Sequence, residues 1–371
     1  MGEELTILLL NGFILMLLLL MQILIPNISR KNILLGVKIP EEKMSTSEVK
    51  EIIKGFKREN IFVGIPTLII LLVLINYFDS VVLISIAPVL YLGVLFAVYI
   101  RWNRKSKELK KEKEWDKLAS NIIFVDTKFS RDKTKYTGIS KKWILIPLVI
   151  ILFNIGLSVA MFPSLPDKIP THWDFQGNID GYMNKSIFVA MMMPMVQMLM
   201  NIIIYFSYYS MTKSKQQIDP NNPEISLRKN IIFRKVWSVY FLIVLVLLEI
   251  LFTVSNMMIL GLINDPGLFN IMNFLFMGII IISSIIISVK IGQGGDRINI
   301  KGEKEASKGY DIDDDRLWKL GNTIYFNPED PSLFVEKRIG VGWTVNGGRP
   351  LGVILLLLPF IIIAITLLLV R

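Results

Sequence analysis

Four polar residues in long apolar stretches are the first candidates for chemistry in this sequence. They are Glu249, within the run Leu-Leu-Glu-Ile-Leu, Gln197 and Asn201, which are four residues apart, and Asn154. Residues four apart share one face of a helix. A charged side chain within lipid costs about 2.5–3.5 kcal/mol on insertion scales, so residues of this kind usually face the interior of a helix bundle. The four therefore predict a buried polar cluster.

Two interpretations of this cluster stay open. No Lys or Arg occupies the middle of any of these stretches, so Glu249 must be protonated or wetted by a cavity. We hypothesise a proton-linked or ligand-binding site formed by the cluster. The alternative is hydrogen bonding between helices, worth about 0.6 kcal/mol per contact on average. Asn273 is a further candidate neighbour.

A second candidate site surrounds the single histidine, in the segment 162–186. Three prolines stiffen this segment and two glycines supply turn positions. The segment is too patterned for a bare linker, and we predict that it binds a ligand. The predicted ligand-binding residues are His172, Trp173, Asp174, Asp180 and Tyr182.

Residue types argue against an enzyme. The sequence has no cysteine and one histidine, so a thiol nucleophile, a thiolate metal site and a multi-histidine metal site are excluded. Neither His-Glu-x-x-His nor Gly-x-Ser-x-Gly occurs. His172 with Asp174 would supply two ligands, too few for a metal site. We expect no catalytic residue, no metal and no cofactor.

The elements that must carry these residues are transmembrane helices. The chain has 371 residues, of which 53% are hydrophobic and 19% charged, and the charges are clustered. A helix needs about 20 mostly apolar residues to cross a bilayer. Eight stretches qualify, and they predict an all-α polytopic membrane protein. The predicted spans are Leu5–Ile25, Ile61–Phe78, Val81–Ile100, Trp143–Met161, Ile187–Ser210, Val236–Leu260, Phe269–Val289 and Leu351–Val370.

Basic residues predict the orientation of these spans. Of the 41 Lys and Arg residues, 38 fall in alternate connections, namely 26–60, 101–142, 211–235 and 290–350. Connections rich in Lys and Arg stay in the cytoplasm. We therefore expect a multi-pass protein of the cell membrane with both termini outside the cytoplasm. The net charge of +10 reflects this topology, and we expect no nucleic-acid partner.

The spans predict five regions. Residues 1–142 form three spans with basic loops, 143–210 a helix–loop–helix with the His172 loop, 211–300 two spans, 301–350 a cytoplasmic segment and 351–371 the last span. Ser45 and Glu48 fit a capping box that opens a short helix through about Arg58. In the fourth region, two aromatic or β-branched runs flank Asn-Pro-Glu-Asp-Pro and predict a small β-hairpin.

Two stretches resemble known families. Leu165-Pro-Asp-Lys-Ile-Pro-Thr-His-Trp173, Asp180-Gly-Tyr182 and Lys185 resemble the DUF1648 domain, found in membrane proteins similar to the immunity protein for the sporulation-delaying toxin of bacilli. Tyr325-Phe-Asn-Pro-Glu-Asp-Pro331 and Gly340-Val-Gly-Trp-Thr344 resemble DUF5808, which has no assigned activity. The first resemblance implies protection against a membrane-active peptide and signalling through a repressor held at the membrane.

We therefore expect a bacterial membrane protein that binds or senses, or that gives immunity against, a membrane-active peptide or envelope stress. Its expected partners are the lipid bilayer, an extracellular peptide and a cytoplasmic regulator. The alternative is a proton-linked transporter that uses Glu249. Internal repeats, which are common in transporters, are not evident, and Pro194 is the mid-span proline expected to break a helix.

Overall fold

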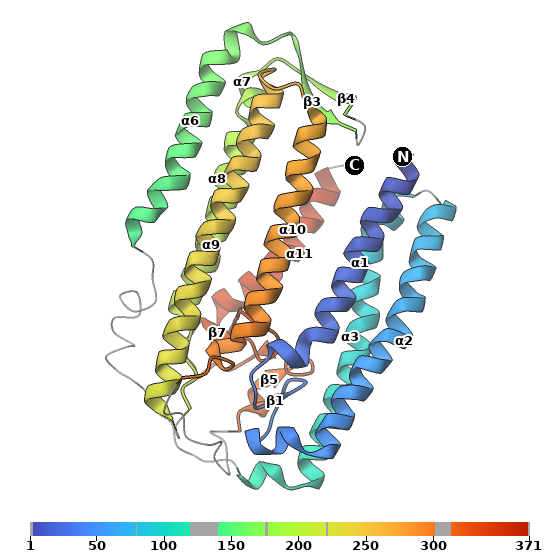
Figure 1. The fold of residues 1–371 in the computed structure, drawn as a ribbon, viewed down its shortest axis with the longest axis vertical. Coiled ribbons are helices and arrows are strands. Elements are labelled where there is room, and N and C mark those ends of the chain that lie inside the picture. Colours follow the sequence, from blue (N-terminus) through green and yellow to red (C-terminus); the bar gives the residue numbers. More distant parts are fainter. Residues whose placement is uncertain are drawn as a thin grey trace. The chain divides into compact units, whose positions relative to one another are not determined.

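The structure, a computed structural model, describes residues 3–78, 80–118, 140–174, 177–219, 222–300 and 313–369, and these are mostly helical (Figure 1). Six of the described helices are long and apolar enough to cross a membrane. They are α1 (Glu3–Ile28), α2 (Ser47–Phe78), α3 (Val81–Glu112), α6 (Leu145–Met161, with the short 3₁₀ helix Phe162–Ser164), α9 (Pro223–Ile259) and α10 (Pro266–Ile291).

Two further helices correspond to the fifth and eighth predicted spans but are not among these six. Helix α8 (Met192–Lys213) carries Gln197 and Asn201, which lower its hydropathy. Helix α11 (Pro350–Leu369) contributes a shorter apolar stretch, Pro350–Pro359.

Large apolar side chains cover the outer faces of these helices. Soluble proteins rarely expose extended apolar surface, because burying it removes it from water. Here the exposed fractions of many Ile, Val and Leu side chains exceed one half, as lipid-facing residues require. Examples from five helices are Ile70 at 58%, Val89 at 66%, Val149 at 63%, Ile202 at 63% and Ile282 at 60%. The molecule is therefore built as a multi-pass membrane protein.

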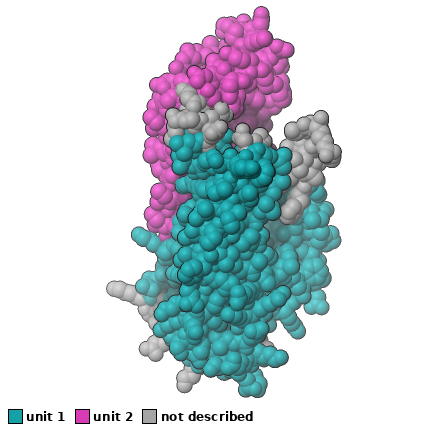
Figure 2. Space-filling view, turned by 90° about the vertical axis from the view of Figure 1, so that its right-hand side faces the viewer, with its two compact units in different colours: residues 1–131, 213–233, 288–371 teal, residues 132–212, 234–287 magenta. Residues whose placement is uncertain are grey.

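The chain forms two compact units (Figure 2). Unit 1 comprises Met1–Arg131, Lys213–Phe233 and Ser288–Arg371, and unit 2 comprises Asp132–Thr212 and Arg234–Ile287. In unit 1, helices α1, α2 and α3 pack on one another through buried leucines, including Leu15, Leu19 and Leu95. The buried Tyr91 donates a hydrogen bond to the carbonyl of Gly64 at 3.1 Å, which ties α3 to α2.

The remainder of unit 1 contains three short hairpins. They are β1 (Ile33–Leu34) with β2 (Val37–Lys38), β5 (Trp318–Lys319) with β6 (Ile324–Tyr325), and β7 (Phe334–Glu336) with β8 (Trp343–Val345). Buried Asn346 links the last two, because its amide donates to the carbonyls of Asn327, Asp330 and Ser332 at 2.8–3.2 Å.

The structure corrects three details of the predicted connections. Ser45 does not cap a helix: it ends a 3₁₀ helix, Glu41–Ser45, and its hydroxyl donates to the carbonyl of Glu42. The following helix runs unbroken from Ser47 to Phe78 instead of stopping near Arg58. The two runs around Asn-Pro-Glu-Asp-Pro do not pair with each other, since each forms a hairpin with its own neighbour. The polar segment 301–312 lies outside the described residues.

Unit 2 holds α6, most of α8, α9 and α10, and one further hairpin, β3 (Lys168–Trp173) with β4 (Ile179–Asn184). The predicted fifth span is divided at Met191 into α7 (Ile187–Ala190) and α8. The division lies three residues before Pro194, which has no N–H for the preceding turn. The β3–β4 hairpin lies in the segment that the sequence predicted as a patterned loop between two helices.

Candidate functional site

A continuous chain of hydrogen-bonded polar side chains runs through unit 2 and connects α6, α8 and α9. Asn154 of α6 lies at its centre. Its side-chain amide donates to Thr253 Oγ1 at 2.7 Å and to Gln197 Oε1 at 3.2 Å, and its Oδ1 accepts from Asn256 at 3.4 Å. Asn256 also donates to Ser158 at 3.2 Å. Three helices are thus joined by polar contacts within an apolar bundle.

Helical spacing explains why these residues meet. Asn154 and Ser158 are four apart in α6, and Gln197 and Asn201 are four apart in α8. In α9 the polar residues follow at positions i, i+4 and i+7, which are Glu249, Thr253 and Asn256. Residues at these spacings line one helix face. We call the seven residues the polar chain; Asn154, Ser158, Gln197, Glu249 and Asn256 have no exposed surface.

Glu249 terminates the polar chain. One carboxylate oxygen accepts a hydrogen bond from the side-chain amide of Asn201, and the other, Oε2, has no hydrogen-bond partner among the described residues. No Lys or Arg within the described ranges forms an ion pair with it. A buried polar atom without a partner costs free energy, so this carboxyl group is the least satisfied member of the chain.

The sequence named four of the seven residues, and the structure places all four in the polar chain. Thr253, Ser158 and Asn256 were missed, although the polar spacing along α9 is a signal that could have found them. Asn273 forms no hydrogen bond with the polar chain among the described residues; its side-chain amide donates at 3.1 Å to the carbonyl of Phe269 in its own helix, α10.

The β3–β4 hairpin displays the predicted loop residues in two different ways. His172 and Asp180 face each other across the strands, with His172 Nδ1 2.5 Å from Asp180 Oδ1. Both are largely exposed, at 71% and 46% of their side-chain surface. Gly181 pairs with His172, and a Cβ at Gly181 would lie 2.7 Å from the His172 Cβ, so glycine leaves room for the histidine. Tyr182 is also exposed, at 55%.

Asp174 does not join His172, because it holds the turn of the hairpin. Its Oδ1 accepts from the backbone N–H of Asn178 at 2.8 Å, and its Oδ2 accepts from the Asn178 side chain at 2.9 Å. Gly177 lies in the same turn with φ of +88°, a conformation that glycine adopts without strain. Asp174 is therefore a structural residue of the turn, and the pair that faces solvent is His172 with Asp180.

The other face of the hairpin is anchored on the helix ends. Ile169 is fully buried against Ile259 and Leu260, at the end of α9, and the partly buried Trp173 packs against the same cluster. Lys185 fixes the base of β4, because its ammonium donates to the carbonyls of Leu165 and Pro163 at 2.7 and 3.0 Å. The hairpin core thus lies one turn beyond the Ser158–Asn256 end of the polar chain.

A charged cluster holds the strands of unit 1 together. Asp314 pairs with Arg338 at 2.5 Å and receives a hydrogen bond from the Trp318 indole at 3.2 Å. Burial alone would raise the pKa of Asp314, but the positive charges of Arg338 and Lys38 outweigh it and lower the pKa to about 2. Lys110 of α3 forms a salt bridge with the neighbouring Asp315, with 2.8 Å between Lys110 Nζ and Asp315 Oδ2. These contacts connect the α3 extension to the β5–β8 region.

The described residues suit binding through hydrogen bonds and charge. Within the described ranges, no three His, Cys, Asp or Glu side chains gather as a metal site would require. What remains is an exposed hairpin surface with a histidine–carboxylate pair, and a buried polar chain that ends at a carboxyl group.

The fold and the polar chain define a multi-pass helical membrane protein. Two of its stretches match known families: residues 149–198 match a domain of unknown function, DUF1648, and residues 328–353 match a family of unknown function, DUF5808. The two resemblances predicted from the sequence are confirmed. The DUF1648 stretch covers the β3–β4 hairpin and three residues of the polar chain, Asn154, Ser158 and Gln197. The DUF5808 stretch covers β7, β8 and the start of α11. Neither the curated proteins nor the solved structures gave a match to this chain.

Proposed function

We propose that this protein spans the cell membrane eight times, with both termini outside the cytoplasm, and that it binds a membrane-active peptide at the β3–β4 hairpin. The alternation of basic connections supports this topology. In that orientation the hairpin faces the outside and the β5–β8 region faces the cytoplasm. α8 and α11 then cross the bilayer with the six more apolar helices.

One observation carries the binding proposal: the hairpin is packed against the helix ends on one face and exposed on the other. Ile169 anchors it with no exposed surface, while His172 and Tyr182 on the open face are more than half exposed. A surface held rigid before binding loses less conformational entropy when it binds. A histidine–carboxylate pair beside a tyrosine suits a peptide, since it offers hydrogen bonds, charge and an aromatic face.

The polar chain supports a sensing role for the same site. It begins one turn below the hairpin core, at Ser158 and Asn256, and it continues to Glu249 through hydrogen bonds between three helices. A peptide that shifts the hairpin would displace Ile169 from the ends of these helices. We propose that the polar chain carries this displacement towards a cytoplasmic regulator.

The test compares two double variants of the full-length protein in cells challenged with a toxin peptide of the sporulation-delaying type. His172→Ala with Asp180→Ala removes the exposed pair. Asp167→Ala with Lys168→Ala removes one acidic and one basic exposed residue at the hairpin base and serves as the matched control. We expect the first to lose protection and the second to keep it. Equal protection in both, at equal membrane levels of the protein, would refute hairpin binding.

A second candidate function, proton-linked transport, is favoured by one observation: Glu249 Oε2 is buried without a partner among the described residues. Full-length protein in liposomes with an entrapped pH dye would report proton movement. Glu249→Gln keeps an oxygen for the Asn201 hydrogen bond but cannot exchange a proton. Transport through Glu249 requires that proton movement stops in this variant, and unchanged movement would remove this candidate.

A further inference from the structure

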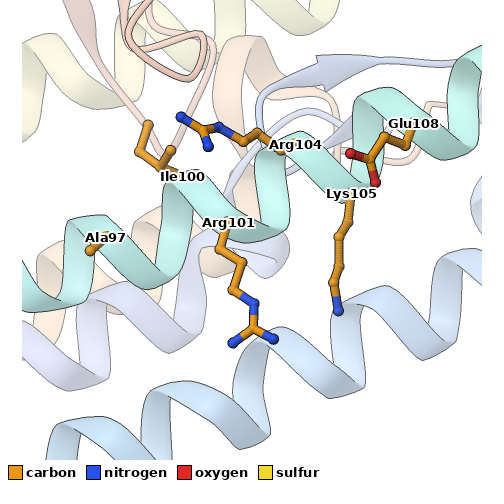
Figure 3. A pocket seen from close by; sticks show the side chains of 6 residues that line it. All are labelled: Ala97, Ile100, Arg101, Arg104, Lys105 and Glu108. Carbon is orange, nitrogen blue, oxygen red and sulfur yellow. The ribbon is translucent and has the colours of Figure 1, made fainter.

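A basic hollow on α3 lies where this helix leaves its apolar segment. It is an open hollow with a volume of about 450 Å³, lined by Ala97, Ile100, Arg101, Arg104, Lys105 and Glu108 (Figure 3). Its two apolar residues come first along the helix and its charged residues follow. Pockets of about 300–1,000 Å³ accommodate small molecules or headgroups. The hollow therefore combines an apolar end and a basic end on one helix face.

The position of these residues matches the boundary of a bilayer. α3 begins at Val81, so Arg101 follows 20 helical residues, which span about 30 Å at about 1.5 Å per residue. This length equals the hydrocarbon thickness of a typical bilayer, also about 30 Å. Arg104 and Lys105 lie a further turn along, about 5 Å beyond this boundary, at the depth of lipid phosphates.

Neighbouring side chains hold two of the three cations in place. Arg101 pairs with Glu59 of α2 at 2.7 Å, and Lys105 lies 4.2 Å from the centroid of the Trp102 ring. Figure 3 shows Arg101 and Lys105 extending from α3 in the same direction, while Arg104 extends from the other edge. Glu59 also accepts a hydrogen bond from the Trp102 indole at 2.7 Å. Contacts with Glu59 of α2 and with Trp102 thus position two of the α3 side chains that line the hollow.

Its charges are not all balanced. Glu59 offsets Arg101, and Glu108 is the one acid in the lining. Arg104 forms no ion pair among the described residues, and Lys105 contacts a ring instead of a carboxylate. A phosphate bound at this end of the hollow would supply the missing negative charge, because guanidinium and ammonium groups donate strong hydrogen bonds to phosphate oxygens.

We propose that this hollow binds the headgroup phosphate of an anionic phospholipid, with an acyl chain along Ala97 and Ile100. A soluble phosphate would use the basic end alone and leave the apolar end empty. A zwitterionic lipid would gain less from the two cations, since its headgroup carries a balancing positive charge. The site depends only on α3 crossing the bilayer and is independent of ligand binding at the hairpin.

Native mass spectrometry of the full-length protein in detergent tests the site. The protein is titrated with dioleoylphosphatidylglycerol, with dioleoylphosphatidylcholine, and with inorganic phosphate. We expect the wild type to retain phosphatidylglycerol in preference to phosphatidylcholine. Arg104→Gln with Lys105→Gln should weaken phosphatidylglycerol binding by about fivefold for each charge removed, and phosphatidylcholine binding should stay unchanged.

The matched control is Lys107→Gln with Lys111→Gln, which removes the same charge from exposed positions of the same helix outside the hollow. This control should keep the lipid preference. An equal loss in both double variants would show that only the total charge matters and would overturn the site. Binding of inorganic phosphate without a preference for phosphatidylglycerol would overturn the lipid as its occupant.

Discussion

Replacing Asn154 with alanine tests whether the polar chain holds α6, α8 and α9 together. Asn154 makes three side-chain hydrogen bonds to other helices, with Gln197, Thr253 and Asn256. Contacts of this kind within membranes contribute about 0.6 kcal/mol each. Asn154→Ala should therefore lower the free energy of unfolding by about 2 kcal/mol, apart from the loss of packing.

Asn273→Ala supplies the control for packing. Asn273 also lies in an apolar helix and is partly buried, but its amide bonds to Phe269 within the same helix. Its replacement removes the same side-chain atoms and no hydrogen bond to another helix. The difference between the two variants isolates the contribution of the contacts between helices.

Reversible unfolding of the full-length protein in bicelles, followed by circular dichroism, measures both free energies. The reasoning predicts that Asn154→Ala is the less stable variant by about 2 kcal/mol. Equal stabilities would refute it and would mean that the polar chain does not stabilise the bundle. A double-mutant cycle with Thr253→Val, whose hydroxyl lies 2.7 Å from the Asn154 amide, should recover about 0.6 kcal/mol of coupling.

Two further predictions concern unit 1. Gly55→Ala should destabilise the protein by about 1–3 kcal/mol, because the added Cβ would overlap the Trp102 ring. Gly93→Ala should stabilise it by up to about 1 kcal/mol, because no atom lies near the added Cβ and alanine favours a helix more than glycine does. The unfolding midpoints of the two variants should therefore shift in opposite directions. Asp314 has a pKa lowered from 3.8 to about 2, so its charge stabilises the fold above about pH 4, and this stabilisation disappears as the pH falls through 2. Asp314→Asn should therefore lower the free energy of unfolding by about 2 kcal/mol at pH 7 and flatten the pH dependence of stability between pH 2 and 4. An unchanged pH dependence in this variant would show that the pairing with Arg338 does not stabilise the fold.

The helices were largely predictable because their determinants are local. Runs of about 20 apolar residues are needed to cross lipid, and the six long apolar helices follow such runs. The same locality made much of the polar chain predictable, since Gln197 and Asn201 share a face through their spacing alone. Which residues of α6 and α9 they meet depends on how the helices pack, and spacing within one helix does not contain that information.

The hairpins were harder to predict because their pairing depends on single backbone conformations. Leu320, Gly321 and Asn322 all have positive φ, of 45°, 67° and 65°. This allows β5 to turn back onto β6 through the four residues 320–323, instead of the first run pairing with the run after Asn-Pro-Glu-Asp-Pro. The β3–β4 hairpin contains Pro170 within a strand and shifts register on either side of His172. Proline is rare in regular strands. A prediction based on the alternation of apolar and polar residues therefore does not find this hairpin.

Structural stabilisation does not by itself explain a glutamate at position 249. A glutamine there could accept the same hydrogen bond from Asn201, offer an amide in place of the unpartnered Oε2 and avoid the insertion cost of a charged group, about 2.5–3.5 kcal/mol. Glu249→Gln should therefore leave stability unchanged or raise it. If this variant unfolds as easily as the wild type or less easily, yet loses peptide protection or proton movement, then the carboxyl group serves the protein's activity. A clear loss of stability would instead assign Glu249 to holding the helices together.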